Sequence, residues 1–256
     1  IQDLSDNHKV GGLTYDISAN VSDAAGNGAV EKSTSFIVDK TKPVIQSVDL
    51  SGIDTYLNIA AAEKDYSLNV VMTNADANGQ NLVLDISGIK DYSGVVNNDK
   101  VTIKLPSKLF KTDLSDNNLD GGKTYNINAS VEDAAGNVSD VKSTSFILDK
   151  TVPVISNIDL EWGTHLNITE GDASQNVTVT RSNADASGET LTVSLNGHDY
   201  TGVVDVSKVT IQIPRADIQD LSDNQLVGGL VTELSANVMD AAENSAAEKT
   251  ASFTVD

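Results

Sequence analysis

The sequence predicts an all-β protein built from tandem two-sheet domains, and three observations support this prediction. Apolar residues make up 39% of the 256 residues and aromatic residues only 4%, so small and β-branched side chains must form the core. Such side chains favour strands over helices. Between short turn segments, apolar and polar residues alternate with a period of two. A long sequence unit also recurs, and its closing part occurs three times.

The repeat is most easily followed in this closing part. Each copy contains a DLSDN segment, a Gly-Gly pair, a DAAGN or DAAEN turn and a strand that ends in aspartate. The copies start at Asp3, Asp113 and Asp220 and end at Asp39, Asp149 and Asp256. The ends are 110 and then 107 residues apart (39 to 149, 149 to 256), which suits a whole domain rather than one solenoid turn. We therefore expect a C-terminal domain fragment over residues 1–39 and complete domains over residues 40–149 and 150–256, all part of a longer protein.

The middle unit shows how each domain is expected to fold. Tyr125, Ile127, Ala129 and Val131 alternate with polar residues, which predicts a strand with one buried face. The same pattern predicts seven strands, over residues 43–50, 67–73, 81–87, 93–96, 101–105, 124–133 and 139–149. About seven short strands per domain without a long helix predict an immunoglobulin-like β-sandwich. Short helical turns are expected only at 106–113 and 214–220.

The predicted domains are joined by Asp-Lys-Thr-Xaa-Pro segments at residues 39–43 and 149–153. These joints are too short to act as flexible tethers. Proline also fixes φ where the next strand begins. The sequence therefore predicts that successive sandwiches form an extended, semi-rigid rod.

The charge excludes several classes of partner. The formal net charge is −20, and the segments 1–39, 40–149 and 150–256 carry −4, −5 and −11, so every repeat is acidic. Nucleic acid and anionic membrane surfaces require basic residues, and neither is expected as a partner. No apolar run is long enough to insert into a membrane. Cysteine is absent, which rules out disulfides and zinc–thiolate sites.

No enzymatic activity is predicted. Motifs for a serine nucleophile, a zinc protease, a phosphate loop or a dinucleotide site do not occur, and the three histidines are scattered. Trp162 has two interpretations: an exposed platform on which a sugar could stack, or an aromatic side chain that closes one end of the sandwich. The first would make the domains themselves bind host glycan or receptor. A further alternative is an accessory module of a carbohydrate-active enzyme.

Several motifs resemble one known family. VEDAAGN (131–137), STSFILDKTVP (143–153), LNGHDYTGVVD (195–205) and KVTIQIPRADI (208–218) are similar to the bacterial Ig-like (BIg) domains of giant, type I-secreted, non-fimbrial adhesins. The resemblance covers nearly the whole chain. It implies a secreted stalk segment at the bacterial cell surface that projects a distal region for cell adhesion and virulence. The implied partners of a monomeric chain are Ca²⁺ near the joints, neighbouring Ig-like domains and, through the parent protein, a host-cell receptor or glycan.

The acidic loops are candidate calcium ligands because strand order in an Ig-like sandwich brings them together. The DAAGN turn and the NADA loop share the pole where a domain begins, while the DLSDN loop and closing aspartate share the opposite pole. The candidates at the first joint are Asp3, Asp6, Asp39, Asp76, Asp133 and Asn137, and those at the second are Asp113, Asp116, Asp149, Asp185, Asp240 and Asn244. Carboxylate and amide oxygens suit calcium. The plain alternative is that these are ordinary turn residues.

Two local features complicate this prediction. Asp116, Asn118, Asp120 and Gly121 match part of a calcium-loop pattern, but the match lacks the closing glutamate and is more typical of a turn. The third copy has Glu243 where the other two have glycine, and glycine at a hairpin usually supplies a positive φ. We expect either that Asn244 adopts this conformation or that the third turn differs.

Overall fold

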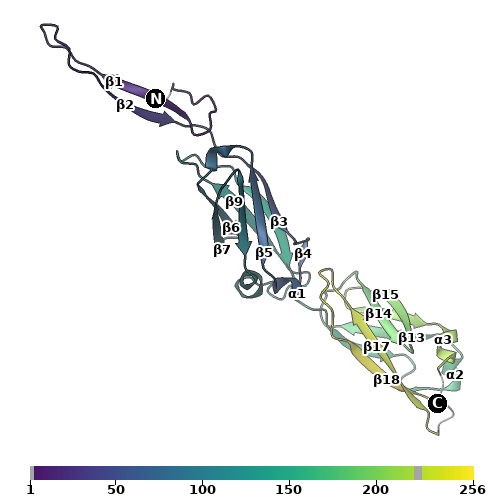
Figure 1. The fold of residues 1–256 in the computed structure, drawn as a ribbon. Coiled ribbons are helices and arrows are strands. Elements are labelled where there is room, and N and C mark those ends of the chain that lie inside the picture. The colour runs from purple at the N-terminus through teal and green to yellow at the C-terminus, as the bar shows by residue number, and fades with distance from the viewer. Residues whose placement is uncertain (1–2, 222–226) are drawn as a thin grey trace. The chain divides into compact units, whose positions relative to one another are not determined.

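The structure is a computed structural model that describes residues 3–221 and 227–256 (Figure 1). The chain divides into two compact units. The first comprises Ile1–Ile53, Asp65–Pro106 and Tyr125–Phe146, and the second comprises Asp54–Lys64, Ser107–Thr124 and Ile147–Asp256. Part of the third DLSDN segment lies outside the described residues. The domain boundaries at 39/40 and 149/150 stay predictions.

The first unit is built from antiparallel strands. Strands β1 (Leu13–Ala19) and β2 (Lys32–Val38) form a two-stranded sheet. Strands β3 (Ile45–Ser51), β5 (Tyr66–Met72) and β8 (Lys100–Leu105) form a sheet in the order β3-β5-β8. Strands β10 (Lys142–Leu148), β9 (Lys123–Val131), β6 (Asn81–Ile86) and β7 (Lys90–Val95) are neighbours, in this order, in another sheet.

The second unit repeats the same topology. Strands β11 (Ile155–Leu160), β13 (Gln175–Arg181) and β16 (Lys208–Ile213) form one sheet in that order. Strands β12 (His165–Leu166), β18 (Lys249–Val255), β17 (Leu230–Val238), β14 (Thr190–Leu195) and β15 (His198–Val203) form the other. Both three-stranded sheets also carry a register shift near the start of their first strand, at Ile45/Ser47 and Ile155/Asn157. The predicted all-β, Ig-like sandwich class is confirmed.

All seven strands predicted for the middle unit are present, but one strand was missed. Strand β4 (Tyr56–Leu57) pairs in parallel with the last two residues of β10, and the backbone N–H of Asp149 donates to Leu57 O at 3.0 Å. A strand of two residues is too short to show the alternation of apolar and polar residues that predicts a strand. Only its distant partner defines it.

Short helices occupy the connections. They are α1 (Ile59–Ala62), η1 (Ala75–Ala77), η2 (Leu109–Asp113), α2 (Ile168–Gly171) and α3 (Arg215–Gln219). The turns predicted at 106–113 and 214–220 are confirmed as η2 and α3, whereas α1, η1 and α2 were not predicted. Asn58 and Asn167 cap α1 and α2, since their side-chain oxygens accept from backbone N–H groups in the first turn.

Alternation of side chains builds the core. In β9 the side chains of Tyr125, Ile127, Ala129 and Val131 are all buried, as predicted, and Tyr125 stacks on Phe146 with ring centroids 5.7 Å apart. The equivalent core in the second unit contains Val177, Val193, Leu234 and Phe253, among others. From β3 to β18, burial of one strand face against the other sheet of the sandwich supplies the main stabilisation, whereas β1 and β2 are largely exposed.

At one glycine of each Gly-Gly pair, steric contacts leave no room for a side chain. A Cβ atom at Gly122 would lie 2.6 Å from Leu148 O, and one at Gly12 or Gly229 would meet Val38 O or Val255 O just as closely. These contacts keep the loop before β1, β9 and β17 against the closing strand. The closing aspartate follows directly, so this packing helps to position it.

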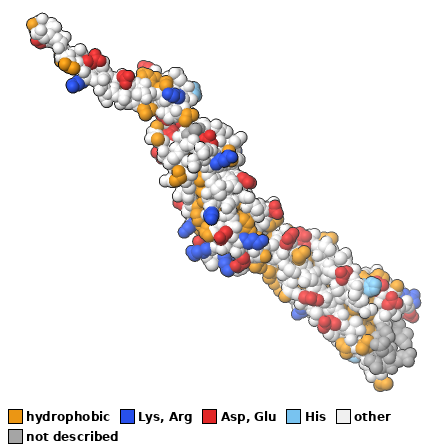
Figure 2. Space-filling view, viewed as in Figure 1, with side chains coloured by type: hydrophobic (Ala, Val, Ile, Leu, Met, Phe, Trp, Pro, Cys, Tyr) orange, Lys and Arg blue, Asp and Glu red, His pale blue; other side chains and the backbone are white. Residues whose placement is uncertain are grey.

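Acidic side chains are spread over the visible surface, while Lys and Arg side chains gather mainly on the middle stretch (Figure 2). This agrees with the sequence count, because residues 40–149 hold ten of the 17 basic residues. In the described part of the chain, no helix has the length and apolar character needed to span a membrane.

Candidate metal centres

The structure brings carboxylates together at two places. In the first unit, oxygens of Asp39, Asp76 and Asp133 lie within 4.8 Å of one another, and in the second unit those of Asp149, Asp185 and Asp240 do the same. We call these groups the first and second carboxylate clusters. In each, the three side chains come from three separate segments: the closing aspartate, the loop between the second and third strands of a sandwich, and the DAAGN or DAAEN turn.

The DAAGN turn presents its aspartate through a fixed set of hydrogen bonds. Asp133 Oδ1 accepts from the backbone N–H groups of Ala135 and Asn137, both at 2.9 Å. Asn137 Nδ2 donates to Asp133 Oδ2 at 2.9 Å and to the backbone oxygen of Asp39 at 3.2 Å. The asparagine therefore ties the turn to the closing aspartate.

The second cluster repeats this arrangement. Asp240 Oδ1 accepts from Ala242 N at 2.9 Å and Asn244 N at 2.8 Å. Asn244 Nδ2 donates to Asp240 Oδ2 at 3.0 Å and to Asp149 O at 3.1 Å. Asn137 and Asn244 therefore contact the clusters through their amide nitrogens, which donate and do not coordinate a cation, and their predicted role as calcium ligands stays a prediction.

The third carboxylate of each cluster has one oxygen held and one free. Gly11 N donates to Asp76 Oδ1 at 2.8 Å, and Gly121 N donates to Asp185 Oδ1 at 2.7 Å. Within the described residues, the other oxygens of Asp76 and Asp185 are buried and have no hydrogen-bond partner, and the same holds for Asp149 Oδ2. Buried carboxylate oxygens without a partner are costly. A cation between them would supply the missing interaction.

Electrostatic repulsion within the clusters shows in the pKa values. Burial, with the neighbouring carboxylates of Asp185 and Asp240 adding to its effect, raises the pKa of Asp149 to about 7. Burial also raises the pKa of Asp39, with Asp76 and Asp133 adding to the effect. Like charges held this close disfavour the ionised state. Each cluster is therefore suited to a positive ion.

Asp6 and Asp116 lie outside the two clusters and hold the joint segments. Asp6 Oδ2 accepts from Lys40 N at 2.8 Å and from Thr41 Oγ1 at 2.7 Å. Hydrogen bonds from Thr41, His8 and Lys40 lower the pKa of Asp6 to about 2. Asp6 and Asp116 are both buried. Their hydrogen bonds to the Asp-Lys-Thr segments explain why this motif and the DLSDN motif occur together.

Asp116 makes the equivalent contacts at the second joint segment. Its Oδ2 accepts from Lys150 N at 2.7 Å and Thr151 Oγ1 at 2.9 Å. Burial alone would raise the pKa of Asp116, but hydrogen bonds from Lys150, Asn118 and Thr151 outweigh it and its pKa lies below the usual value. The ammonium group of Lys150 also donates to three carbonyl oxygens, those of Phe110, Lys111 and Leu114.

The remaining predicted ligands lie apart from the clusters. Asp3 is exposed in a turn, and Asp113 ends η2, where it pairs with Lys108 Nζ at 3.1 Å. The structure does not bring either into a cluster of carboxylates.

The partial calcium-loop match at residues 116–121 forms turns. Asp116 Oδ1 accepts from Asn118 N at 3.2 Å, and Asn117 and Asn118 both have positive φ. Asp120, which belongs to this partial match but not to the ligands predicted at the joints, accepts from Ala184 N at 3.2 Å. Burial raises the pKa of Asp185, and the carboxylates of Asp240 and Asp120 add to this effect.

The conformation of the third turn differs from both alternatives that we expected. Glu243 itself adopts a positive φ of 68°, where Gly26 and Gly136 have 90° and 91°. The turn keeps the same hydrogen bonds, including Glu243 N to Asp240 O at 3.1 Å. Both expectations were therefore wrong, because the surrounding hydrogen bonds impose the glycine conformation on glutamate.

Trp162 closes one end of the sandwich, and this interpretation is confirmed. Its side chain is 6% exposed and packs edge-on against Phe253 with centroids 5.2 Å apart. The interpretation as an exposed sugar platform is wrong, because the side chain is buried in the core.

No protein-family model matches the chain, and no curated protein matches it. Among solved structures, it is similar to a Ca²⁺-stabilized adhesin that helps an Antarctic bacterium bind ice (23% identity, TM-score 0.43), covering 96% of this chain and 58% of that one. It is also similar to a 1.5-MDa bacterial ice-binding adhesin (21% identity, TM-score 0.47), covering 95% and 74% of the two chains. A bacterial immunoglobulin-like domain of the M. primoryensis ice-binding adhesin covers 42% of this chain and 96% of its own (20% identity, TM-score 0.29). The fold assignment rests on the sheet topology described above.

Proposed function

We propose that the chain is a stalk segment of a secreted bacterial adhesin, made of tandem Ig-like domains that Ca²⁺ stiffens at the two carboxylate clusters. The motif resemblance described above supports membership of the bacterial Ig-like domain family. The observation that carries the calcium proposal is the second cluster, in which three buried carboxylates from three segments converge within 4.8 Å. In this proposal the domains are residues 1–39, 40–149 and 150–256.

Calcium fits the chemistry of these clusters better than other common metals. Each cluster contains oxygen donors alone, and Ca²⁺ binds six to eight oxygens in irregular arrangements. Zinc and copper prefer histidine or thiolate, and the chain has no cysteine. The three carboxylates would supply part of the coordination shell of the ion, and backbone oxygens and water would complete it.

The mechanical role follows from the origin of the ligands. Asp149 belongs to the joint segment, Asp185 to the loop after β13, and Asp240 to the turn after β17. Without a cation these carboxylates repel one another, and with one they are held together. Binding to the folded state alone also stabilises it. The segment would then project a distal receptor-binding region and take no part in catalysis.

Isothermal titration calorimetry tests this proposal: the chain is first stripped of metal with a chelator, and Ca²⁺ is then titrated into it. We expect two ions per chain, with Asp39→Asn removing one and Asp149→Asn removing the other. Asp49→Asn and Asp159→Asn are matched controls, because both residues are exposed on strands and lose the same charge. Absence of calcium binding, or equal loss in the control variants, would overturn the proposal.

A further inference from the structure

The ammonium group of Lys150, the residue that follows Asp149, lies among backbone carbonyl oxygens. It donates to Phe110 O at 3.2 Å, to Lys111 O at 3.3 Å and to Leu114 O at 3.1 Å. An ammonium group has three N–H donors, so each donor has an acceptor here. Lys150 is half-buried, and all of these residues belong to the second unit. We call the three oxygens the carbonyl cage.

The segment that forms most of the cage contains an extra residue. Residues 106–113 form a segment one residue longer than the equivalent segment, residues 214–220. In η2 the backbone N–H of Leu114 donates to Leu109 O, five residues back, at 2.8 Å, which is the pattern of a π-helix. Such wide turns are rare and are frequent at functional sites. Two of the three cage oxygens, those of residues 110 and 111, belong to this turn.

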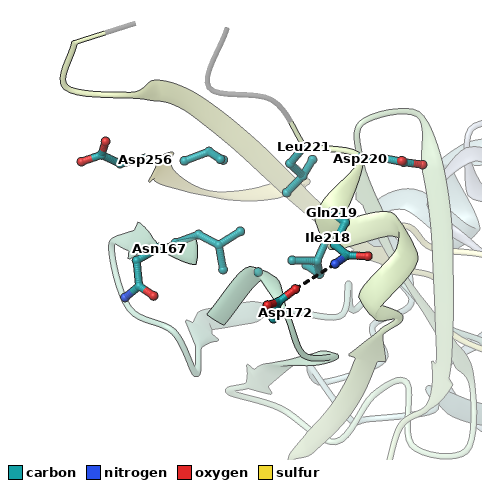
Figure 3. Close-up of a pocket in the computed structure, with 10 residues that line it drawn as sticks. Asn167, Asp172, Ile218, Gln219, Asp220, Leu221 and Asp256 are labelled. Carbon is teal, nitrogen blue, oxygen red and sulfur yellow. Dashed lines mark hydrogen bonds between the residues drawn. The ribbon is translucent and has the colours of Figure 1, made fainter. Parts of the chain in front are cut away.

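The equivalent segment before the third DLSDN motif has an ordinary helical turn. Asp220 N donates there to Ala216 O, four residues back, at 3.1 Å. Figure 3 shows this segment, from which Gln219 Nε2 donates to Asp172 Oδ1 at 3.0 Å. Of the two segments, the one with the π-turn is therefore the one that holds the ammonium group of Lys150.

The cage adds to a set of contacts that hold the chain around Asp149. Asp149 O accepts from Asn244 Nδ2 at 3.1 Å, and Lys150 N donates to Asp116 Oδ2 at 2.7 Å. Thr151 N donates to Asp149 Oδ1 at 3.1 Å. The other carboxylate oxygen, Asp149 Oδ2, is buried without a hydrogen-bond partner in the described part of the chain. The direction of this free oxygen therefore depends on where residues 150 and 151 lie.

We propose that Lys150 is a positioning residue for calcium at the second carboxylate cluster, and that the carbonyl cage gives it this role. By holding the side chain of Lys150, the cage fixes the peptide that follows Asp149. It thereby fixes the direction of the free Asp149 oxygen. Groups that orient metal ligands in this way typically change metal affinity by about 10- to 100-fold. This inference rests on the proposed function, because it requires an ion at the second cluster.

Positioning and direct electrostatics predict opposite results when the charge of Lys150 is removed. A nearby positive charge repels Ca²⁺, so the loss of the charge alone would tighten calcium binding. The loss of positioning would weaken it. The sign of the change in calcium affinity therefore distinguishes the two effects.

Calcium titration in two single-site backgrounds measures this sign. Asp39→Asn leaves only the second cluster intact, and Asp149→Asn leaves only the first. In the Asp39→Asn background, Lys150→Met should weaken calcium binding about tenfold. The control Lys104→Met removes an exposed lysine of β8 and should leave the affinity unchanged. In the Asp149→Asn background, Lys150→Met should not change calcium binding.

Deletion of Thr112 perturbs the cage from its other side. Thr112 is exposed, and its deletion shortens the segment to the length found before the third DLSDN motif. We expect the deletion to weaken binding at the second cluster as Lys150→Met does. The two changes combined should add little to either alone, because they disrupt the same contact. Thermal unfolding in chelator checks that each variant remains folded.

Amide hydrogen exchange in chelator separates this inference from the proposed function. The backbone N–H of residue 150, which donates to Asp116, should exchange faster in Lys150→Met than in the parent chain. Unchanged exchange would overturn the inference alone, and so would calcium binding that Lys150→Met leaves unchanged or tightens in the Asp39→Asn background. Absence of calcium binding by the parent chain would overturn the proposed calcium sites, and this inference with them.

Discussion

The two carboxylate clusters have the same three ligand types but different surroundings. In the first, Asp39 is partly exposed, whereas in the second the exposed fraction of Asp149 is 0%. Strand β4 lies beside Asp149, whose backbone N–H donates to Leu57 O at 3.0 Å. The comparison shows that the repeated turns supply the carboxylates, while neighbouring elements decide how deeply they are buried.

A second difference lies at the end of the strand before each cluster. Strand β5 ends in Met72 and strand β13 ends in Arg181, and both side chains are buried. Arg181 Nη2 donates to three oxygens, yet its Nε and Nη1 have no partner among the described residues. Its charge interacts with Asp120 and Asp185. The second cluster is thus more buried but also partly balanced by a fixed cation.

The largest expected effect concerns the stabilisation by calcium. At calcium concentrations about 100 times the dissociation constant, each bound ion should raise the free energy of unfolding by about 2.7 kcal/mol. We expect Asp149→Asn to lose this increment and also to stabilise the calcium-free chain, because one buried charge is removed. Asp39→Asn should also lose the increment that calcium adds. In the presence of chelator, its free energy of unfolding should change little. Calorimetry with and without calcium measures both, and equal behaviour of the two variants would remove the contrast between the clusters.

The next effect is the pH dependence of the calcium-free chain. The folded-state pKa of Asp149, about 7, lies above its ordinary value of 3.8, so the folded state binds the proton more tightly than the unfolded state. This contribution to stability is complete below pH 3.8 and is lost as the pH rises through 7. We expect this loss of stability to fall between pH 4 and 8. Denaturant unfolding at several pH values checks this, with Asp149→Asn expected to flatten the profile.

A smaller effect should follow from exchanging the residues at the ends of β5 and β13. Arg181→Met removes the fixed cation, and calcium affinity at the second cluster should rise about tenfold, or about 1.4 kcal/mol. Met72→Arg should weaken the first cluster by a similar factor. Titration of both variants measures the change, and opposite signs at the two sites are required. Unchanged affinities would mean that Arg181 has only a packing role.

The smallest expected effect is at the third turn. Glu243 holds a positive φ of 68°, which costs an ordinary residue about 1 kcal/mol relative to glycine. Glu243→Gly should therefore raise the free energy of unfolding by about that amount. Gly136→Glu in the equivalent turn should lower it. Thermal unfolding of the two variants provides the measurement, and a destabilised Glu243→Gly would show that the glutamate side chain makes a compensating contact.

The sequence by itself determined the all-β class, the seven strands of the middle unit and the sets of acidic loops that meet. These depend on local patterns: side-chain alternation in strands such as β9, and turn residues such as those around Asp133. Strand order then places the loops. Asp39, Asp76 and Asp133 were predicted at one joint, and the structure brings these three together.

Only the tertiary structure separated Asp6 and Asp116 from the clusters, because their roles depend on which backbone N–H groups come within reach. The same holds for β4, whose two residues pair with a strand about 90 residues away, and for the buried charge of Arg181. Burial and hydrogen-bond satisfaction arise from segments that are distant in sequence. A local pattern shows which oxygens are available, but only the packed fold decides which of them lack a partner.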